Sequence, residues 1–301
     1  MKAIRYLPLL LALPAAQALA DSPIKLSHPA TPSTLVNISN ISGEVTVTAW
    51  DRNEVQVDGR LGDGAQPLAI TGSDDNLAVK VQAQGKSGGW FNWGSDSTMG
   101  SSTLELHVPK GASLKIDVIS APLGIDGIDG GDVAIKTISG KVRINARMSS
   151  LKVSSVSGGV ELAGHAEHAD LQTVSGDILA PSLGGSAELH TTSGRIHVDG
   201  GPWQQLNLST VSGDVQVAGK LAAGGTIGID SMSGDAQLQL PADVSSAIHA
   251  STFSGDLRSD FGTPEKSGHG PSSQLNATAG NGNGKITVET FSGDLRIRKQ
   301  D

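Results

Sequence analysis

The chain has 301 residues and a formal net charge of −8, with 30 Asp and Glu against 22 Lys and Arg. This acidic balance disfavours nucleic acid as a partner, because phosphate recognition needs clustered basic side chains. The chain contains no Cys, so disulfides and thiol chemistry are excluded, and we expect no lipoprotein anchor. Aromatic residues make up 3% and Gly 39 of the 301 residues, a composition typical of thin, repetitive β-structures.

Residues 1–20 predict a secretory signal peptide. Lys2 and Arg5 precede an apolar stretch, and Ala18-Leu19-Ala20 is an A-x-A cleavage site. The apolar stretch is too short to span a bilayer, although a retained anchor remains the alternative. Cleavage would leave 20 basic against 30 acidic residues, a charge of −10. We therefore expect an exported protein, periplasmic, on the outer surface or secreted, with no transmembrane segment after cleavage.

Residues 21–113 predict an irregular β-sheet that begins the fold and caps it. Apolar residues alternate in four short runs separated by turn residues: Val45/Val47, Val55/Val57, Leu77/Val79/Val81 and Leu104/Leu106/Val108. Residues 84–102 form a Gly/Ser-rich loop that carries Trp90, Phe91 and Trp93. Composition predicts that this loop is mobile.

A Ser-Gly pair in an apolar frame recurs along the chain. The serines are Ser42, Ser139, Ser157, Ser175, Ser193, Ser212, Ser233, Ser254 and Ser292. From Ser139 to Ser254 they follow one another at 18, 18, 18, 19, 21 and 21 residues, and Ser120 heads a further copy without the Gly. A period near 20 is the signature of stacked repeats. The sequence thus predicts ten rungs of a single all-β solenoid with rungs of ~18–21 residues.

Each rung follows one template when its Ser is numbered zero. Apolar residues recur at −6, −4, −1, +3 and +5; in the Ser212 rung they are Leu206, Leu208, Val211, Val215 and Val217. The period of two within each pair predicts strands with one buried face. All five positions are expected to face the core, so a corner or bulge must lie between −4 and −1. The Gly at +1 is expected where the backbone approaches the next rung too closely for a Cβ.

The repeats divide the mature chain further. The regular solenoid is expected over residues 114–258, a Gly/Ser/Pro/Asn-rich loop over 259–284 and a terminal rung over 285–301. The charged residues Arg296, Arg298 and Lys299 would protect the last strand as an open edge of the stack.

Three sequence features together resemble a known family. They are Val36–Asp51, the L-x-L-x-V-P-K-G run that ends at Gly111, and the repeated T-x-S-G-D pattern. The chain resembles the bacterial putative-adhesin family of β-strand-repeat proteins, a domain of unknown function, over roughly Leu35 to Arg298. The resemblance implies an exported or envelope-associated β-solenoid and supplies no catalytic residues.

Two sets of side chains are candidate metal sites. Asp occupies position +2 in five rungs, as Asp177, Asp214, Asp235, Asp256 and Asp294. Stacked carboxylates repel one another, and Ca²⁺ could relieve this; the alternative is that they point into water or support the turn. His165 and His168, with Asp170 nearby, form the second set, but strand spacing does not bring both rings to one ligand face. We expect no metal and no cofactor, and Ca²⁺ is not required for folding.

An enzymatic role is the weaker alternative. Arg143, Arg195 and the Asp column could be assembled into a polysaccharide-cleaving site on a β-helix, yet ten similar rungs make any such cluster easy to find. No nucleophile motif is present. The prediction is therefore no enzyme and no catalytic residue.

Position −2 is Thr or Ser in eight rungs, which predicts an outward T-x-S column together with the Ser at zero. The residues are Thr137, Ser155, Thr173, Thr191, Thr210, Ser231, Thr252 and Thr290. Such a column supports the corner by hydrogen bonds, or it presents an ice- or carbohydrate-binding surface.

The sequence favours a structural or interaction scaffold whose partner is an unidentified envelope protein or glycan. Trp90, Phe91 and Trp93 are the candidate partner-binding residues. Their alternative is to plug the end of the core.

Overall fold

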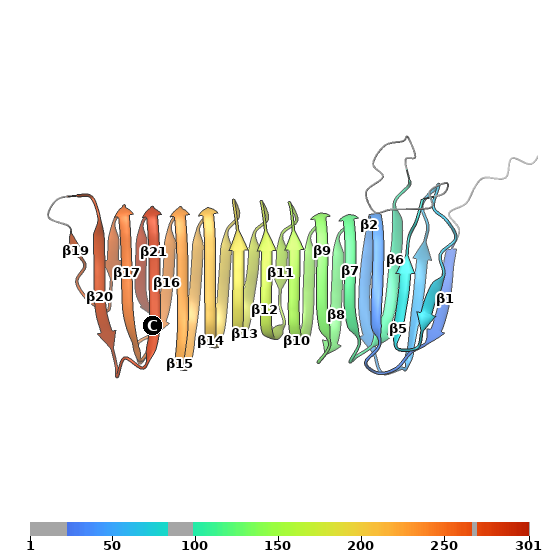
Figure 1. The fold of residues 1–301 in the computed structure, drawn as a ribbon, viewed down its shortest axis with the longest axis horizontal. Helices are drawn as coiled ribbons and strands as arrows, with labels where there is room; N and C mark the ends of the chain where they lie inside the picture. Colours follow the sequence, from blue (N-terminus) through green and yellow to red (C-terminus); the bar gives the residue numbers. More distant parts are fainter. Residues whose placement is uncertain (1–22, 84–98, 267–269, 301) are drawn as a thin grey trace, which may run out of the picture.

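The computed structural model describes residues 23–83, 99–266 and 270–300. These residues form an all-β, solenoid-like stack in one 22-stranded hydrogen-bonded sheet, and they contain no helix (Figure 1). The predicted signal peptide and the aromatic residues Trp90, Phe91 and Trp93 lie outside the described residues. The all-β prediction is therefore confirmed for the described part of the chain.

The strands of the N-terminal half are β1 (Pro23–Pro29), β2 (Leu35–Trp50), β3 (Glu54–Arg60), β4 (Ile70–Ser73), β5 (Asn76–Lys80), β6 (Ser102–Pro109), β7 (Ser113–Ser120), β8 (Leu123–Asp129), β9 (Asp132–Ser139), β10 (Val142–Ser155) and β11 (Val160–Leu162). Those of the C-terminal half are β12 (His165–Thr173), β13 (Ile178–Thr191), β14 (Ile196–Ser212), β15 (Val215–Ser233), β16 (Ala236–Pro241), β17 (Ser246–Ser254), β18 (Leu257–Ser259), β19 (Glu265–Lys266), β20 (Ser273–Ala279), β21 (Gly284–Ser292) and β22 (Leu295–Gln300).

Neighbouring rungs pair in parallel with equivalent template positions aligned. At position −4, Val153 pairs with Leu171, Leu171 with Leu189, and Leu189 with Leu208. Each rung has a first strand that leads into the Ser-Gly corner and a second strand that leaves it. The aligned register places like side chains above one another and forms one continuous, narrow core between the two strand layers.

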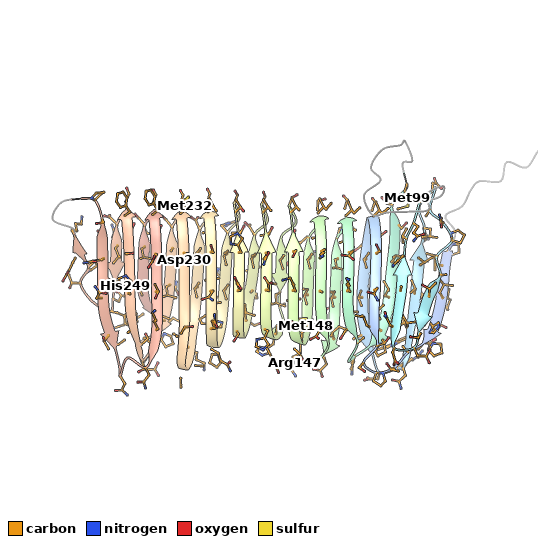
Figure 2. The ribbon with its side chains drawn as sticks, viewed as in Figure 1. Met99, Arg147, Met148, Asp230, Met232 and His249 are labelled. Carbon is orange, nitrogen blue, oxygen red and sulfur yellow. The ribbon has the colours of Figure 1, made fainter. Side chains whose placement is uncertain are left out.

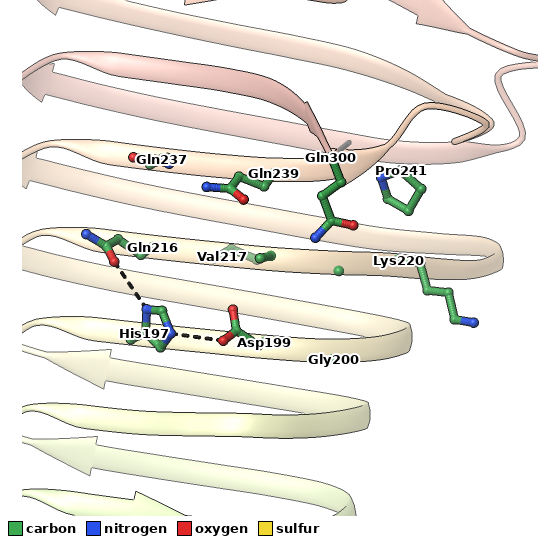
Figure 3. Close-up of a pocket in the computed structure, with 12 residues that line it drawn as sticks. His197, Asp199, Gly200, Gln216, Val217, Lys220, Gln237, Gln239, Pro241 and Gln300 are labelled. Atoms are coloured by element: carbon green, nitrogen blue, oxygen red, sulfur yellow. Dashed lines mark hydrogen bonds and ion pairs between the residues drawn. The ribbon is translucent and has the colours of Figure 1, made fainter.

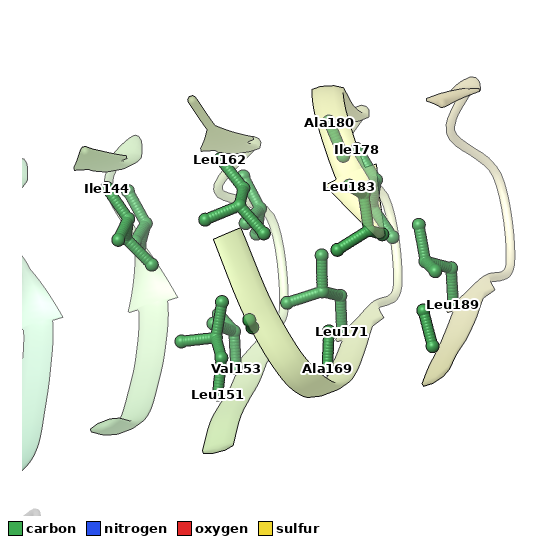
Figure 4. Close-up of a cluster of buried hydrophobic side chains, with 14 of the residues drawn as sticks. Ile144, Leu151, Val153, Leu162, Ala169, Leu171, Ile178, Ala180, Leu183 and Leu189 are labelled. Atoms are coloured by element: carbon green, nitrogen blue, oxygen red, sulfur yellow. The ribbon is translucent and has the colours of Figure 1, made fainter. Parts of the chain in front are cut away.

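The core consists of the apolar residues at −6, −4, +3 and +5, as the template predicts. Figure 4 shows this packing for the middle of the stack, where Leu151, Val153, Leu171 and Leu189 come from first strands and face Ile178 from a second strand. All five side chains are at most 1% exposed. A fully buried aliphatic side chain contributes about 1.5–3 kcal/mol, so the repeated burial accounts for stability without disulfides.

The inward placement of position −1 is wrong. Val156 and Val174 are 46% and 47% exposed, whereas Ser155 and Thr173 at −2 are 6% and 3% exposed. Alternation therefore continues unbroken from −6 through −4 to −2, and the parity changes at the Ser-Gly corner itself. The predicted outward T-x-S column is wrong for the same reason, because its Thr and Ser residues at −2 face the core. A binding surface built on that column is excluded with it.

The Gly at +1 lies where the backbone of the adjacent rung leaves no room for a side chain. A Cβ on Gly213 would collide with the carbonyl oxygen of Gly194, and one on Gly234 would collide with that of Gly213. Gly234 also has a φ of +135°, which L-residues with side chains rarely adopt. The predicted close approach at this position is confirmed.

At the C-terminal end, the rungs do not stack in chain order. β21 pairs with β15 on one side and β17 on the other, and β22 lies between β16 and β18. The rung of Ser292, last in the chain, thus sits inside the stack (Figure 1). The interpretation of β22 as an open edge is wrong, because both of its edges are paired.

The same arrangement closes the N-terminal end. The complete rung formed by β2 lies between β5 and β6 on one side and β7 and β8 on the other. After β2, the chain forms the N-terminal end of the stack with β3 to β6. It then returns to the other side of β2 with β7 and β8. At the C-terminal end the outgoing segment includes residues 259–284, where β20 pairs antiparallel with β17. Residues expected to form a loop therefore form a capping strand, which Leu275 anchors at 1% exposure.

Candidate binding surfaces

The stack carries a line of exposed apolar side chains along one edge, interrupted in the Ser193 rung by the half-buried Thr192. Of the nine large hydrophobic residues that are exposed among the described residues, eight occupy position −1. We call this line the apolar ridge; in spatial order its members are Ile41, Ile138, Val156, Val174, Val211, Met232, Phe291 and Phe253. It follows the edge where the chain turns through the Ser-Gly corners, and Figure 2 shows Met232 on that edge.

At three middle corners the hydroxyl at −2 explains why the ridge faces outward. The N–H groups of Gly158, Gly176 and Gly194 donate to the hydroxyls of Ser155, Thr173 and Thr191 at 2.9, 3.0 and 3.0 Å. A buried amide must find an acceptor, so the hydroxyl is held inside the corner. The next side chain along an extended strand then points to solvent.

The ridge is largest where the rungs of Ser233, Ser292 and Ser254 adjoin. Met232 is 61%, Phe291 59% and Phe253 51% exposed. The two Phe rings stack with their centroids 4.9 Å apart and an interplanar angle of 7°. This end presents a rigid apolar surface on hydrogen-bonded strands.

The Asp column beside the ridge links one rung to the next. Asp214 accepts the backbone N–H of Asp235 at 3.0 Å, Asp235 that of Asp294 at 2.9 Å, and Asp294 that of Asp256 at 3.1 Å. Asp177 does the same for Arg195 at 2.8 Å. One oxygen of each of these four carboxylates is therefore engaged with the main chain. This supports the turn interpretation of the Asp column over a Ca²⁺ ladder.

Neither candidate metal set forms a ligand cluster in the described ranges, where no three His, Asp or Glu side chains are close enough to hold an ion. His165 and His168 are exposed on β12. The carboxylate of Asp170 lies 2.5 Å from Lys152 Nζ. Its hydrogen bond and its charge raise the pKa of Lys152.

The basic residues of the enzymatic alternative are paired with acids on the outer face of the second strands. Arg195 lies 3.3 Å from Asp177, and Arg143 lies 3.6 Å from Glu161. Lys141, 2.6 Å from Glu161, lowers the pKa of that carboxyl, first by its hydrogen bond and then by its charge. A general acid needs a raised pKa, so the direction of this shift disfavours Glu161 in that role.

The predicted aromatic anchor lies outside the described residues, and the strands on either side of it adjoin one corner. Lys80 of β5 pairs with Ser39, and Ser102 of β6 pairs with Gly43. The end of β5 and the start of β6 therefore lie beside the corner that carries Ile41. That corner is the N-terminal end of the apolar ridge.

Sequence reasoning missed the ridge because it assigned every apolar template position to the core. The signal that could have revealed it is the regular Thr or Ser at −2. A hydroxyl two residues after a buried −4 position keeps the same strand parity, and this forces position −1 outward.

A family model described as Toastrack DUF4097 matches residues 33–298. Among solved structures, a putative cell adhesion protein from Clostridium sporogenes is 11% identical, covers 93% of this chain and 100% of its own, and has a TM-score of 0.24. A putative adhesin from Bacteroides fragilis and a putative lipid binding protein from Parabacteroides distasonis are each 13% identical, cover 93% of this chain and 97% of their own, and have TM-scores of 0.41. No curated protein matches the chain.

Proposed function

This chain belongs to the Toastrack DUF4097 family, and we propose that it is an exported, non-enzymatic β-solenoid scaffold of the cell envelope that binds a macromolecular partner in the manner of an adhesin. The apolar ridge is the binding surface. The observation that carries the proposal is that, of the nine large hydrophobic side chains exposed among the described residues, eight lie in that single line.

Physical reasoning supports binding as the purpose of the ridge. Water-soluble proteins rarely expose a contiguous apolar patch unless something covers it, and Met232, Phe291 and Phe253 form such a patch on adjoining rungs. Ten rungs at a spacing of about 4.8 Å give the ridge a length of about 43 Å. Because its side chains stand on paired strands, little conformational freedom is lost on binding, which favours affinity.

Other features agree with a scaffold that acts outside the cytoplasm. The signal-peptide pattern of residues 1–20 supports export. No helix long and apolar enough to cross a membrane occurs in the described part of the chain. The Asp column is engaged with the main chain, which supports a structural role for these carboxylates.

The test compares two triple variants of the mature protein immobilised on a biosensor, with vesicles prepared from the source organism's envelope as the probe. Met232→Ser, Phe291→Ser and Phe253→Ser together should abolish vesicle retention. The control changes Lys115, Ala134 and Lys152 to Ser, an outward row on the first strands, and should retain vesicles as the unmodified protein does. Equal retention by both variants, or no retention by the unmodified protein, would contradict the proposal.

A further inference from the structure

A second surface lies on the outer face of the second strands and, unlike the apolar ridge, is polar. A hollow of about 560 Å³ opens over β14, β15, β16 and β22 (Figure 3). We call it the amide groove, after its polar lining of His197, Asp199, Gln216, Gln237, Gln239 and Gln300. His197, Gln216 and Gln237 are aligned on three successive strands.

Small residues create the hollow. Ala218 pairs with Asp199 on one side and with Gln239 on the other, so it leaves a gap in a row of larger polar side chains. Gly219 continues the floor next to Ala218. A Cβ on Gly219 would collide with the carbonyl oxygen of Gly200 and lie 2.7 Å from the ring of Trp203 below. The depth of the groove is therefore fixed by core packing.

The lining has unused hydrogen-bonding capacity. Gln237, Gln239 and Gln300 are half-buried, and their side chains have no hydrogen-bond partner among the described residues. By contrast, His197 is held between Gln216 at 3.2 Å and Asp199 at 3.0 Å. None of their amide atoms is among the buried, unpartnered polar atoms of the described residues, so these amides are accessible from solvent and free to hydrogen-bond to a ligand.

The charge of the lining limits the class of ligand. Asp199 and Lys220 are its only residues with full charges, and they are opposite in sign. Amides donate and accept hydrogen bonds, as hydroxyl groups do. The groove therefore matches an uncharged ligand that presents many hydroxyls.

The shape indicates a chain rather than a single sugar. A second hollow of about 620 Å³ shares His197 and Gln216 with the first and continues along the stack to Lys141. Its charged lining residues are Lys141, Glu161, Arg195, Asp177 and Asp214, and the first four neutralise one another in the ion pairs described above. The two hollows together span the rungs from Ser139 to Ser292. In the described part of the chain, no aromatic ring other than that of His197 lines either hollow, so each sugar would be held by hydrogen bonds without a stacking platform.

We propose that the amide groove binds a linear, uncharged glycan chain, laid across successive second strands. Single sugars bind weakly there, and affinity accumulates over several rungs because linked contacts act at high effective concentration. The ridge takes no part, so this site goes beyond the binding surface proposed above.

The test is affinity electrophoresis of the mature protein in native gels that contain dextran, pullulan, glucomannan or polygalacturonate. At least one of the three uncharged polymers should retard the protein, and polygalacturonate should not. Ala218→Gln fills the gap and should abolish the retardation. Ala134→Gln makes the same change at an exposed position on β9, outside both hollows, and should leave the retardation unchanged.

Three outcomes would overturn the proposal: no retardation by any uncharged polymer, retardation by polygalacturonate alone, or equal retardation of Ala218→Gln and the unmodified protein. If Ala218→Gln lowers the thermal midpoint, the pair Gln237→Ala and Gln239→Ala replaces it, since both side chains point outward. The ridge triple variant should still be retarded, and this separates a failure of the groove from a failure of the ridge.

Discussion

The corners of the middle rungs and those of the C-terminal rungs close by different means. At Ser157, Ser175 and Ser193 the hydroxyl at −2 accepts the Gly N–H of its own corner. At Ser233 and Ser292 the Gly N–H donates instead to the backbone carbonyl of the next rung, at 3.0 Å in both cases. The middle corners are thus closed within a rung, and the C-terminal corners between rungs.

The buried hydroxyl at −2 therefore contributes differently to stability in the two regions. Those of Ser231 and Thr290 have no hydrogen-bond partner among the described residues. The C-terminal rungs compensate with Asp carboxylates that accept the N–H of the following rung. The comparison teaches that one sequence template can be stabilised by two different hydrogen-bond networks.

The largest effect is expected at Gly213, on the boundary between the regions. Gly213→Val places a branched side chain against the carbonyl of Gly194, and the variant should lose several kcal/mol of unfolding free energy or fail to fold. Gly124→Val on β8, where the nearest atoms beyond its own chain neighbours lie 4.0 Å from a Cβ, is the matched control. Denaturant unfolding measures both; equal stabilities would show that the corner is not crowded.

A matched pair of substitutions tests the comparison itself. Thr173→Val leaves the N–H of Gly176 without its acceptor and should cost about 1–3 kcal/mol. Thr290→Val removes a buried hydroxyl that has no partner, so stability should be unchanged or rise by up to about 1 kcal/mol. Similar losses in both variants would mean that the two regions close their corners in the same way.

The Asp column gives a smaller effect. Asp235→Ala removes the acceptor of the Asp294 N–H and should cost about 0.5–1.5 kcal/mol. Asp235→Asn keeps an acceptor oxygen and should restore most of the stability. Excess chelator should not alter the thermal midpoint of the unmodified protein; a large fall would indicate a bound cation.

The smallest effect is a dependence on pH in the middle rungs. Lys141 lowers the pKa of Glu161 below its ordinary value of 4.5. A lowered folded-state pKa stabilises the protein above the unfolded-state pKa, and this contribution is lost as the pH falls through the folded-state value. Glu161→Gln should therefore reduce the loss of thermal midpoint below about pH 4.5. An unchanged acid profile would show that the ion pair does not contribute.

The repeat period and the alternation of apolar residues were sufficient to predict part of the fold. The all-β class, the buried residues at −6, −4, +3 and +5, and the crowded Gly at +1 all follow from side-chain pattern. The spatial order of the ends was not predictable in this way, because Ser292 fits the template equally well inside the stack or at its end. Only the pairing of β21 with β15 and β17 decides between these positions.

The binding surfaces were harder to predict for physical reasons. Apolar character at −1 suggests burial, and only the hydroxyl bound at the corner shows that Val174 must face outward. The amide groove depends on Ala218 lying in register between Asp199 and Gln239. These residues are separated by about a rung each, and no local pattern marks them as neighbours.

The central claim is that position −1 faces solvent and position −2 faces the core. Because the chain contains no Cys, a single introduced thiol can measure this directly. Val174→Cys and Thr173→Cys each introduce a single thiol, whose reaction with a maleimide is followed on the native protein. We predict rapid labelling of the thiol at 174 and protection of the thiol at 173, with the same contrast between Phe253→Cys and Thr252→Cys. Protection at 174 with rapid labelling at 173 would return the apolar residue to the core and contradict the ridge.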